Sequence, residues 1–406
     1  MFRALQFPNF RWFLLSQACA MTGTWMQQVA LGWLVFEMTG SAFHLGLVGA
    51  AATIPSFALS PIAGVMADRF DRRRIVVTIQ VFAAIHSLVL ALLVAGGRAT
   101  VEMLIGLSLL LGVAQAFDWP TRQSLVVHLV EGRTHLGNAI ALNSTIFNLA
   151  RIGGPSFAGL LLGLDRGAWC FGFAALASGL ALAAMTRIRM STTTAPRAGG
   201  AWGREFRAGA GYAWREPAIR RSLALVALAS GCIMPYAALL PLFAAEVLAG
   251  DARLYGLLAA APAVGAVTGG LLLARRASSA GLPRQIRAMG AIAPVSVAMF
   301  AVSRFLPLTL AALIVLGGAM MVWMSSINTR LQSTVVERMR GRVMSFFVMA
   351  LMGALPCGYL VMGALAEHAG PTVAVLTGAA LCLAGNFWLH RVARAERPAL
   401  LSGEPA

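Results

Sequence analysis

Charged residues are scarce in this sequence, and lysine is missing altogether. Only 12% of the 406 residues are charged, and all 32 basic residues are Arg. Soluble domains carry about 25% charged residues. Apolar residues make up 59% of the chain. Twelve helical spans of about 20 residues would use about 240 residues and leave only short connections. These proportions exclude a soluble enzyme and indicate a protein that crosses a membrane many times.

The sequence also lacks the motifs of ATP-driven pumps and of membrane enzymes. It contains no ATP-binding P-loop, no zinc-ligand spacing and no Gly-x-Ser-x-Gly nucleophile elbow. Its cysteines all fall inside predicted spans and form no Cys-x-x-Cys pair, so they predict neither a disulfide framework nor a metal site. They are Cys19, Cys170, Cys232, Cys357 and Cys382. We therefore expect no catalytic residue, no cofactor and no metal.

The apolar pattern divides into twelve segments, and the arginines gather on alternate connections between them. The segments lie near 12–36, 43–67, 75–95, 101–121, 138–163, 168–186, 222–246, 255–275, 286–303, 306–327, 343–366 and 372–390. The Arg-rich connections share one side with both termini, and the positive-inside rule places that side in the cytosol. The net charge of +17 is thus an orientation signal. It predicts contacts with anionic lipid headgroups and no nucleic-acid partner.

The chain is predicted to be an all-α membrane protein with two similar halves. A first six-helix half (1–186) and a second (222–392) flank a cytosolic linker (187–221), and a cytosolic tail (393–406) follows. The linker pattern from Trp202 onward predicts a short interfacial amphipathic helix that ends at Pro217.

An internal repeat supports the division into halves. Gln123-Ser124 recurs as Gln332-Ser333, and Gly132-Arg133 recurs as Gly341-Arg342. Two six-span repeats of the same orientation imply a pseudo-two-fold axis along the membrane normal. Proteins built in this way rock their halves about a central site.

The connection between spans two and three carries the strongest local motif. It reads Gly64-Val-Met-Ala-Asp68-Arg69-Phe-Asp71-Arg72-Arg73-Arg74. This resembles the loop signature Gly-x-x-x-Asp-Arg-x-Gly-Arg-Arg of the major facilitator superfamily, from which Asp71 departs. The resemblance implies a conformational latch made by Gly64, Asp68, Arg69, Arg72, Arg73, Asp118 and Arg122. In that latch, Arg72 would pair with Asp118. The alternative is an ordinary basic loop.

Further motifs resemble one branch of that superfamily, the transmembrane secretion effectors, which include enterobactin exporters. They are Asp118-x-Pro-x-Arg122-Gln, Asn9-Phe-Arg, Thr39-Gly-Ser, Ala67-Asp-Arg-x-Asp-Arg-Arg and Asn148-x-x-Arg151-x-x-Gly-Pro. The resemblance implies an exporter fold and leaves the substrate open.

Span five contains an arginine deep in an apolar segment. Arg151 lies about 14 residues, or about 21 Å, into the segment. Two interpretations stay open, because an intramembrane Arg marks either a substrate pathway or an ion pair. It would attract an anionic substrate in the cavity, or it would pair with Asp118 or backbone carbonyls. The adjacent Gly154, Pro155 and Gly159 resemble the span-five antiporter signature, which implies a bent helix in close contact with the other half.

Polar side chains inside spans one and five are candidates for the substrate cavity. Thr24, Gln27 and Gln28 share one face of a helix, and Asn143 and Asn148 lie in span five. The alternative for each is a hydrogen bond between helices that never meets substrate. His86, alone in span three, is interpreted as a packing residue rather than a proton relay.

No carboxylate lies in the middle of a predicted span, which disfavours cationic drugs as cargo. We therefore expect a monomeric secondary transporter in a bacterial cytoplasmic membrane. It would export a small amphiphilic or anionic metabolite, siderophore- or drug-like, with proton antiport through Asp118 or Glu37 as one option. The alternatives are uptake or lipid transport by the same fold, and a transport-dead membrane sensor or scaffold.

Overall fold

The computed structural model describes residues 3–130, 133–189, 202–274 and 281–402, and this part of the chain contains helices and no strands. The chain forms two compact units, which are described separately. Unit 1 comprises Met1–Ala198 and Ala238–Ala263, and unit 2 comprises Gly199–Ala237 and Val264–Ala406.

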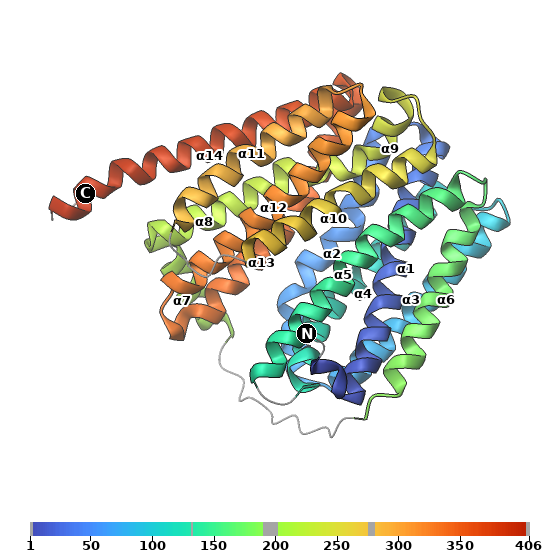
Figure 1. Cartoon of the computed structure of the whole chain (residues 1–406), viewed down its shortest axis with the longest axis horizontal. Coiled ribbons are helices and arrows are strands. Elements are labelled where there is room, and N and C mark those ends of the chain that lie inside the picture. Colours follow the sequence, from blue (N-terminus) through green and yellow to red (C-terminus); the bar gives the residue numbers. More distant parts are fainter. Residues whose placement is uncertain (1–2, 131–132, 190–201, 275–280, 403–406) are drawn as a thin grey trace. The chain divides into compact units, whose positions relative to one another are not determined.

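Unit 1 is built on six long helices, drawn from blue to green in Figure 1. They are α1 (Pro8–Thr39), α2 (Ala42–Arg69), α3 (Arg72–Ala95), α4 (Val101–His128), α5 (Arg133–Leu162) and α6 (Gly167–Thr186), preceded by η1 (Arg3–Gln6). Helix α2 packs on α4, α1 packs on α5 and α6, and α3 packs on α4 and α6.

Unit 2 contains the later helices and the beginning of the seventh predicted span. Its helices are α7 (Trp202–Arg215), α8 (Pro217–Leu228), η2 (Ala229–Ile233), η3 (Met234–Leu239), α11 (Leu282–Val302), α12 (Leu306–Thr334), α13 (Glu337–Ala369) and α14 (Pro371–Ser402). The short helices α9 (Leu240–Leu242) and η4 (Phe243–Val247) and the start of α10 (Ala252–Ala274) belong to unit 1. Within unit 2, α11 packs on α12 and α14, and α13 packs on α8 and α14.

Each of the twelve predicted spans falls on helical structure, and ten helical segments of the described chain are long and apolar enough to cross a membrane. The two remaining predicted spans correspond to α1 and α5. These helices carry the polar residues that the sequence marks as cavity candidates, among them Gln27 on α1 and Arg151 on α5. The polar residues that make α1 and α5 candidates for the functional site thus also lower the hydropathy of these two helices.

The seventh predicted span, 222–246, is not one continuous α-helix. It passes from α8 through η2, η3 and α9 to η4. Pro235 and Pro241 lie inside the interrupted part, where the missing N–H and the ring disfavour a regular helix. Conversely, α4 continues through Pro120 to His128, so this proline does not end the helix.

Side-chain caps fix three helix starts in unit 1. Ser41 accepts a hydrogen bond from the His44 N–H, and Thr100 accepts one from the Met103 N–H. The Asp71 carboxylate accepts from the backbone N–H of Arg73 at 2.9 Å. Such caps stabilise a helix start by about 1 kcal/mol. Asp71, which departs from the common loop signature, therefore has a structural role as the N-cap of α3.

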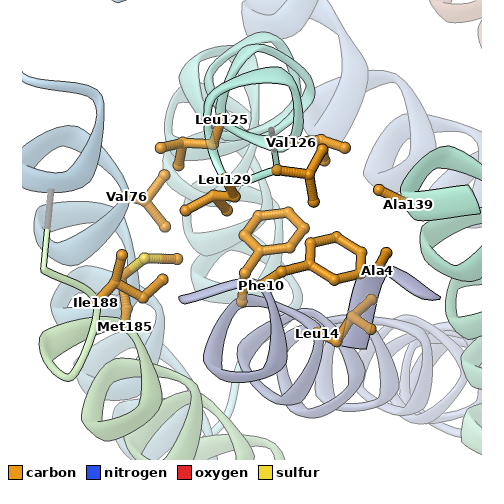
Figure 2. Packing of buried hydrophobic residues seen from close by; sticks show 12 residues of the cluster. Ala4, Phe10, Leu14, Val76, Leu125, Val126, Leu129, Ala139, Met185 and Ile188 are labelled. Carbon is orange, nitrogen blue, oxygen red and sulfur yellow. The ribbon is translucent and has the colours of Figure 1, made fainter. Parts of the chain in front are cut away.

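An apolar cluster joins five helices of unit 1 near the end that carries the N-terminus (Figure 2). The rings of Phe10 and Phe13 from α1 stack with centroids 6.2 Å apart. Val76 of α3, Leu125 of α4 and Met185 of α6 complete the packing around them. This cluster holds the starts of α1 and α3 against the ends of α4 and α6.

The predicted amphipathic linker helix corresponds to α7, which packs on α13. A Cβ at Gly209 would lie 3.0 Å from the Arg342 Cβ, so the two helices are in close contact there. Ala213 is buried and Trp214 is exposed. The side chains of Trp202 and its next four neighbours lie outside the described part.

Candidate functional site

A buried charged pair lies on α4. Arg122 donates from Nε to both carboxylate oxygens of Asp118 at 2.8 Å, and from Nη1 to the Gln17 Oε1 at 3.1 Å. Arg122 is 2% exposed and Asp118 is 9% exposed. The spacing of four residues places both side chains on one face of the helix. Removing one partner of such a pair leaves the other charge buried without a counter-charge, which strongly destabilises the fold. Both residues are therefore needed for this packing.

The latch residues are only partly described. Helix α2 includes Gly64, Asp68 and Arg69, but their side chains lie outside the described part of the chain. The Arg72 Nη1 lies 3.2 Å from the His128 Nε2, and Arg73 donates to the Thr186 carbonyl at 2.7 Å. Arg73 thus binds the end of α6.

The Asp118 carboxylate binds Arg122, and the expected pairing of Arg72 with Asp118 stays a prediction. The latch as a whole stays a prediction.

A strip of aromatic rings leads to Arg151. The Arg151 Cζ lies over the Trp25 ring, 5.4 Å from its centroid. Phe147 meets Trp25 edge-to-face with centroids 6.0 Å apart, and meets Trp119 edge-to-face at 5.5 Å. The strip therefore joins α1, α4 and α5. A cation over an indole face is stabilised by the ring quadrupole, by about 0.5 to 2 kcal/mol.

Both interpretations of Arg151 stay open. The Asp118 carboxylate binds Arg122, and the Arg151 guanidinium lies over the Trp25 ring. Trp25, Trp119 and Phe147 were not among the predicted site residues. A sequence signal exists for Phe147 alone, which lies four residues before Arg151 on α5 and hence on the same face.

A second, neutral network surrounds His86. Its Nε2 lies 2.9 Å from the Leu107 carbonyl, and its Nδ1 lies 3.4 Å from the Gln27 Nε2. Ser87 donates to the Gln27 Oε1 at 2.6 Å. Gln27 is 4% exposed. These contacts support a helix-to-helix role for Gln27, the alternative to lining the cavity.

The other cavity candidates differ in exposure. Gln28 is exposed, whereas Thr24 is half-buried and donates to the Ala20 carbonyl at 2.9 Å. Asn148 is half-buried and donates to the Ser144 carbonyl at 2.8 Å. Asn143 is half-buried, and its buried Oδ1 has no hydrogen-bond partner in the described structure.

The span-five glycines bring α5 against two helices. A Cβ at Gly154 would lie 2.8 Å from the Trp25 Cβ of α1. On the other side, a Cβ at Gly159 would lie 2.9 Å from the Gly256 Cα of α10, and a Cβ at Gly256 would lie 2.6 Å from the Pro155 carbonyl oxygen. Cβ atoms do not fit at these distances, so glycine is required for the helices to approach.

Contacts near the end of α5 extend this close approach. The Arg253 Nη2 donates to the Gly163 carbonyl at 3.1 Å. Tyr255 stacks on Trp33 of α1 with ring centroids 5.8 Å apart. We call the meeting of α1, α5 and the start of α10 the α5–α10 contact. It joins residues of the second half of the sequence to helices of the first half within unit 1.

Metal ligands do not gather in the described part of the chain. Among the described residues, no three His, Cys, Asp or Glu side chains lie together as a metal site. The site chemistry consists of a cation on α5 with aromatic neighbours, a buried ion pair and a neutral hydrogen-bond network.

Comparisons with known proteins agree with this fold. The transmembrane secretion effector family matches residues 1–401, and the chain belongs to that family of major facilitator transporters. The chain is 23% identical to the staphyloferrin A transporter of Staphylococcus aureus (strain NCTC 8325 / PS 47), over 93% of this chain and 95% of that protein. It is 27% identical to the multidrug efflux pump Tap of Mycolicibacterium fortuitum, over 88% of this chain and 89% of that protein.

Solved structures show the same architecture. The nucleoside transporter NupG aligns with a TM-score of 0.72 at 14% identity, covering 94% of this chain and 98% of that one. At this identity the likeness concerns the fold. The protein is thus a multi-pass membrane protein of a transporter family, as the loop and span-five motifs indicate.

Proposed function

We propose that the protein is a secondary transporter that exports a small amphiphilic or anionic metabolite by alternating access. The observation that carries this proposal is Arg151 over Trp25, on two predicted span helices that are not among the ten most clearly apolar segments. An Arg inside a membrane helix is costly, and a pathway for charged or polar cargo justifies it. The ring strip of Trp25, Phe147 and Trp119 adds a surface for apolar parts of the same cargo.

In the proposed topology all twelve segments span a bacterial cytoplasmic membrane and both termini lie in the cytosol. Residues 1–186 and 222–392 form the two halves, 187–221 the linker and 393–406 the tail. The placement of the arginines supports this orientation. The protein would act as a monomer, as the cavity between two halves of one chain suffices for alternating access.

The α5–α10 contact would act as a gate in the proposed cycle. Its glycines allow close approach in one state, and rocking of the halves would separate Gly159 from Gly256 in the other. The latch around Asp68 and Arg72 would stabilise the opposite state. Protons would couple through Asp118, whose neutralisation would weaken its contact with Arg122, or through Glu37.

The class of cargo follows from the cation and from the relatives. A staphyloferrin A transporter and a multidrug efflux pump are both similar over most of the chain. An anionic siderophore-like or drug-like amphiphile suits a cavity that offers Arg151 and aromatic rings. Uptake or lipid transport by the same fold, and a transport-dead sensor, are the competing functions.

The direct test compares metabolites in the medium and in cells of a null strain and a complemented strain. Export predicts a compound that is depleted from the null strain's medium and accumulates in its cells. A compound that stays in the null strain's medium would mean uptake. The same profiles in both strains, in iron-poor and iron-rich growth, would contradict transport and favour the sensor.

A further inference from the structure

Two adjoining hollows lie at one end of unit 1, where α1 and α3 begin and α6 ends. The first, of about 400 Å³, is lined by Trp12, Arg187 and Arg189 together with Pro8, Asn9 and Thr186. The second, of about 300 Å³, is lined by Arg73 and Arg74 and shares Thr186 with the first. The first has no place in the proposed transport cycle, and the second includes Arg73, one of the predicted latch residues.

Arginine is the one charged residue type among the residues that line the two hollows. The Asp71 carboxylate lies 3.7 Å from the Arg74 Nε, and the Arg74 side chain is 89% exposed. Asp71 also caps α3 through the Arg73 N–H, so its charge is shared with the helix start. The hollows therefore keep an excess of positive charge.

The basic side chains stand on a fixed backbone. Asn9 donates from Nδ2 to the Arg189 carbonyl at 2.8 Å, and its Oδ1 accepts from the Arg189 N–H at 3.1 Å. The Arg187 Cζ lies over the Trp12 ring, 5.8 Å from the centroid. Arg73 is held by the carbonyls of Met185 and Thr186. These contacts fix the backbone of α6 beyond its last turn against the start of α1.

The position of the hollows indicates which anion they take. They lie at the ends of apolar spans, where a bilayer changes from hydrocarbon to headgroups. Trp12 is 37% exposed, and tryptophan is enriched at that boundary. Basic pockets between transmembrane helices bind acidic lipid headgroups, and the guanidinium fork matches phosphate oxygens.

We propose that the two hollows, the Trp12–Arg187 hollow and the Arg73–Arg74 hollow, form a binding site for the phosphate headgroup of an anionic phospholipid. The lipid phosphate would contact Arg187 and Arg189, and its acyl chains would run along the apolar surfaces of α3 and α6. Such a lipid stabilises the joint between the starts of α1 and α3 and the end of α6. The site is independent of whether the chain transports a metabolite.

The test titrates the purified full-length protein in neutral detergent with dioleoylphosphatidylglycerol and follows bound lipid by native mass spectrometry. An arginine near an anionic surface contributes a factor of about five in affinity. The double variant Arg187→Gln/Arg189→Gln is therefore expected to bind about 25-fold more weakly than the wild type. Arg166→Gln is the matched control, since Arg166 is exposed and precedes the opposite end of α6. It should change the affinity less than twofold.

Two further measurements keep the test decisive. In the wild type, a photoactivatable phosphatidylglycerol should label the peptides that contain Trp12 or Arg187, which requires no variant to fold. Labelling confined to other peptides, or equal affinities in the double variant and the wild type, would overturn the site. If inorganic phosphate displaces the lipid at equal concentration, the hollows bind a soluble anion and the lipid assignment is wrong.

Discussion

The interiors of the two units differ in how they use polar residues. In the described part of the chain, the buried charged side chains are Asp118 and Arg122, and both lie in unit 1. Buried polar residues of unit 2 include Ser230 and Thr309, which bond to nearby carbonyls, and Asn386. Unit 1 thus has a buried charged pair in its helix packing, whereas the fully buried polar residues described in unit 2 are neutral. Arg221 of unit 2 is half-buried, with a buried Nη1.

Glycines make close helix contacts in both units, so close packing alone does not distinguish them. In unit 2 a Cβ at Gly269 would lie 2.8 Å from the Gly318 carbonyl oxygen, as tight as the contact of Gly159 with Gly256 in unit 1. From this difference in charge we predict that unit 1 carries the elements that respond to cargo or protons.

The largest expected effect follows from breaking the buried ion pair. Arg122→Leu leaves the Asp118 carboxylate without its cation and should lower the free energy of unfolding by about 3 to 5 kcal/mol. Ser326→Ala, at a buried position of unit 2, should cost less than about 1 kcal/mol. Denaturant unfolding in detergent measures both. Equal losses would remove the distinction between the units.

The second-largest expected effect follows from adding a side chain to the α5–α10 contact. Gly159→Val places atoms where the Gly256 Cα lies, and overpacking of this kind costs about 1 to 3 kcal/mol. The substitution destabilises the state in which Gly159 and Gly256 are in contact, so the export rate should drop about tenfold or more. Gly153→Val is the control, because a Cβ at Gly153 meets no atom within 4 Å. An equal drop in both variants would show a general effect of valine in α5.

Removing the charge of Arg151 should weaken cargo binding. Arg151→Gln is expected to raise the KM for the exported compound about tenfold, equivalent to about 1.4 kcal/mol, with little change in kcat. The KM of Arg151→Lys should lie between those of the wild type and Arg151→Gln, because lysine retains the charge but lacks the planar group that lies over Trp25. Transport kinetics in vesicles measure these values, with Arg98→Gln, at an exposed position outside the helices, as control. An unchanged KM in Arg151→Gln would show that Arg151 contributes to helix packing and not to cargo binding.

The smallest effect concerns the neutral network. Gln27→Leu removes the contacts of Gln27 with His86 and Ser87 and should lower the free energy of unfolding by about 1 to 2 kcal/mol. Thr24→Val, which loses one bond to the Ala20 carbonyl of its own helix, should cost about half as much. A large change in cargo affinity with unchanged stability would instead place Gln27 in the cavity.

The sequence predicts the helical elements well, because each depends on a local pattern. Twelve apolar segments fall on helices, and the amphipathic pattern after Trp202 predicts α7. The family resemblance, carried by the loop and span motifs, is confirmed. The interruption of span seven is harder to predict, since Pro120 and Pro155 lie inside intact helices while Pro235 does not.

Site contacts are harder to predict, because they depend on helix rotation and on residues far apart in the sequence. Composition singles out Gln27 and Gln28 together, yet one is buried against α3 and the other is exposed. The Arg122–Asp118 pair follows the four-residue helical spacing, but its third member, Gln17, comes from α1. The aromatic neighbours of Arg151 likewise come from three helices.

The most direct test of alternating access through the α5–α10 contact is a reversible cross-link. Gly163→Cys and Arg253→Cys replace two residues whose side-chain and backbone atoms already touch, in a background where the five native cysteines are substituted. Cross-linking with a short thiol-reactive reagent should abolish export of the compound identified in the null strain, and a reductant should restore it. Undiminished export by a fully cross-linked protein would contradict the account.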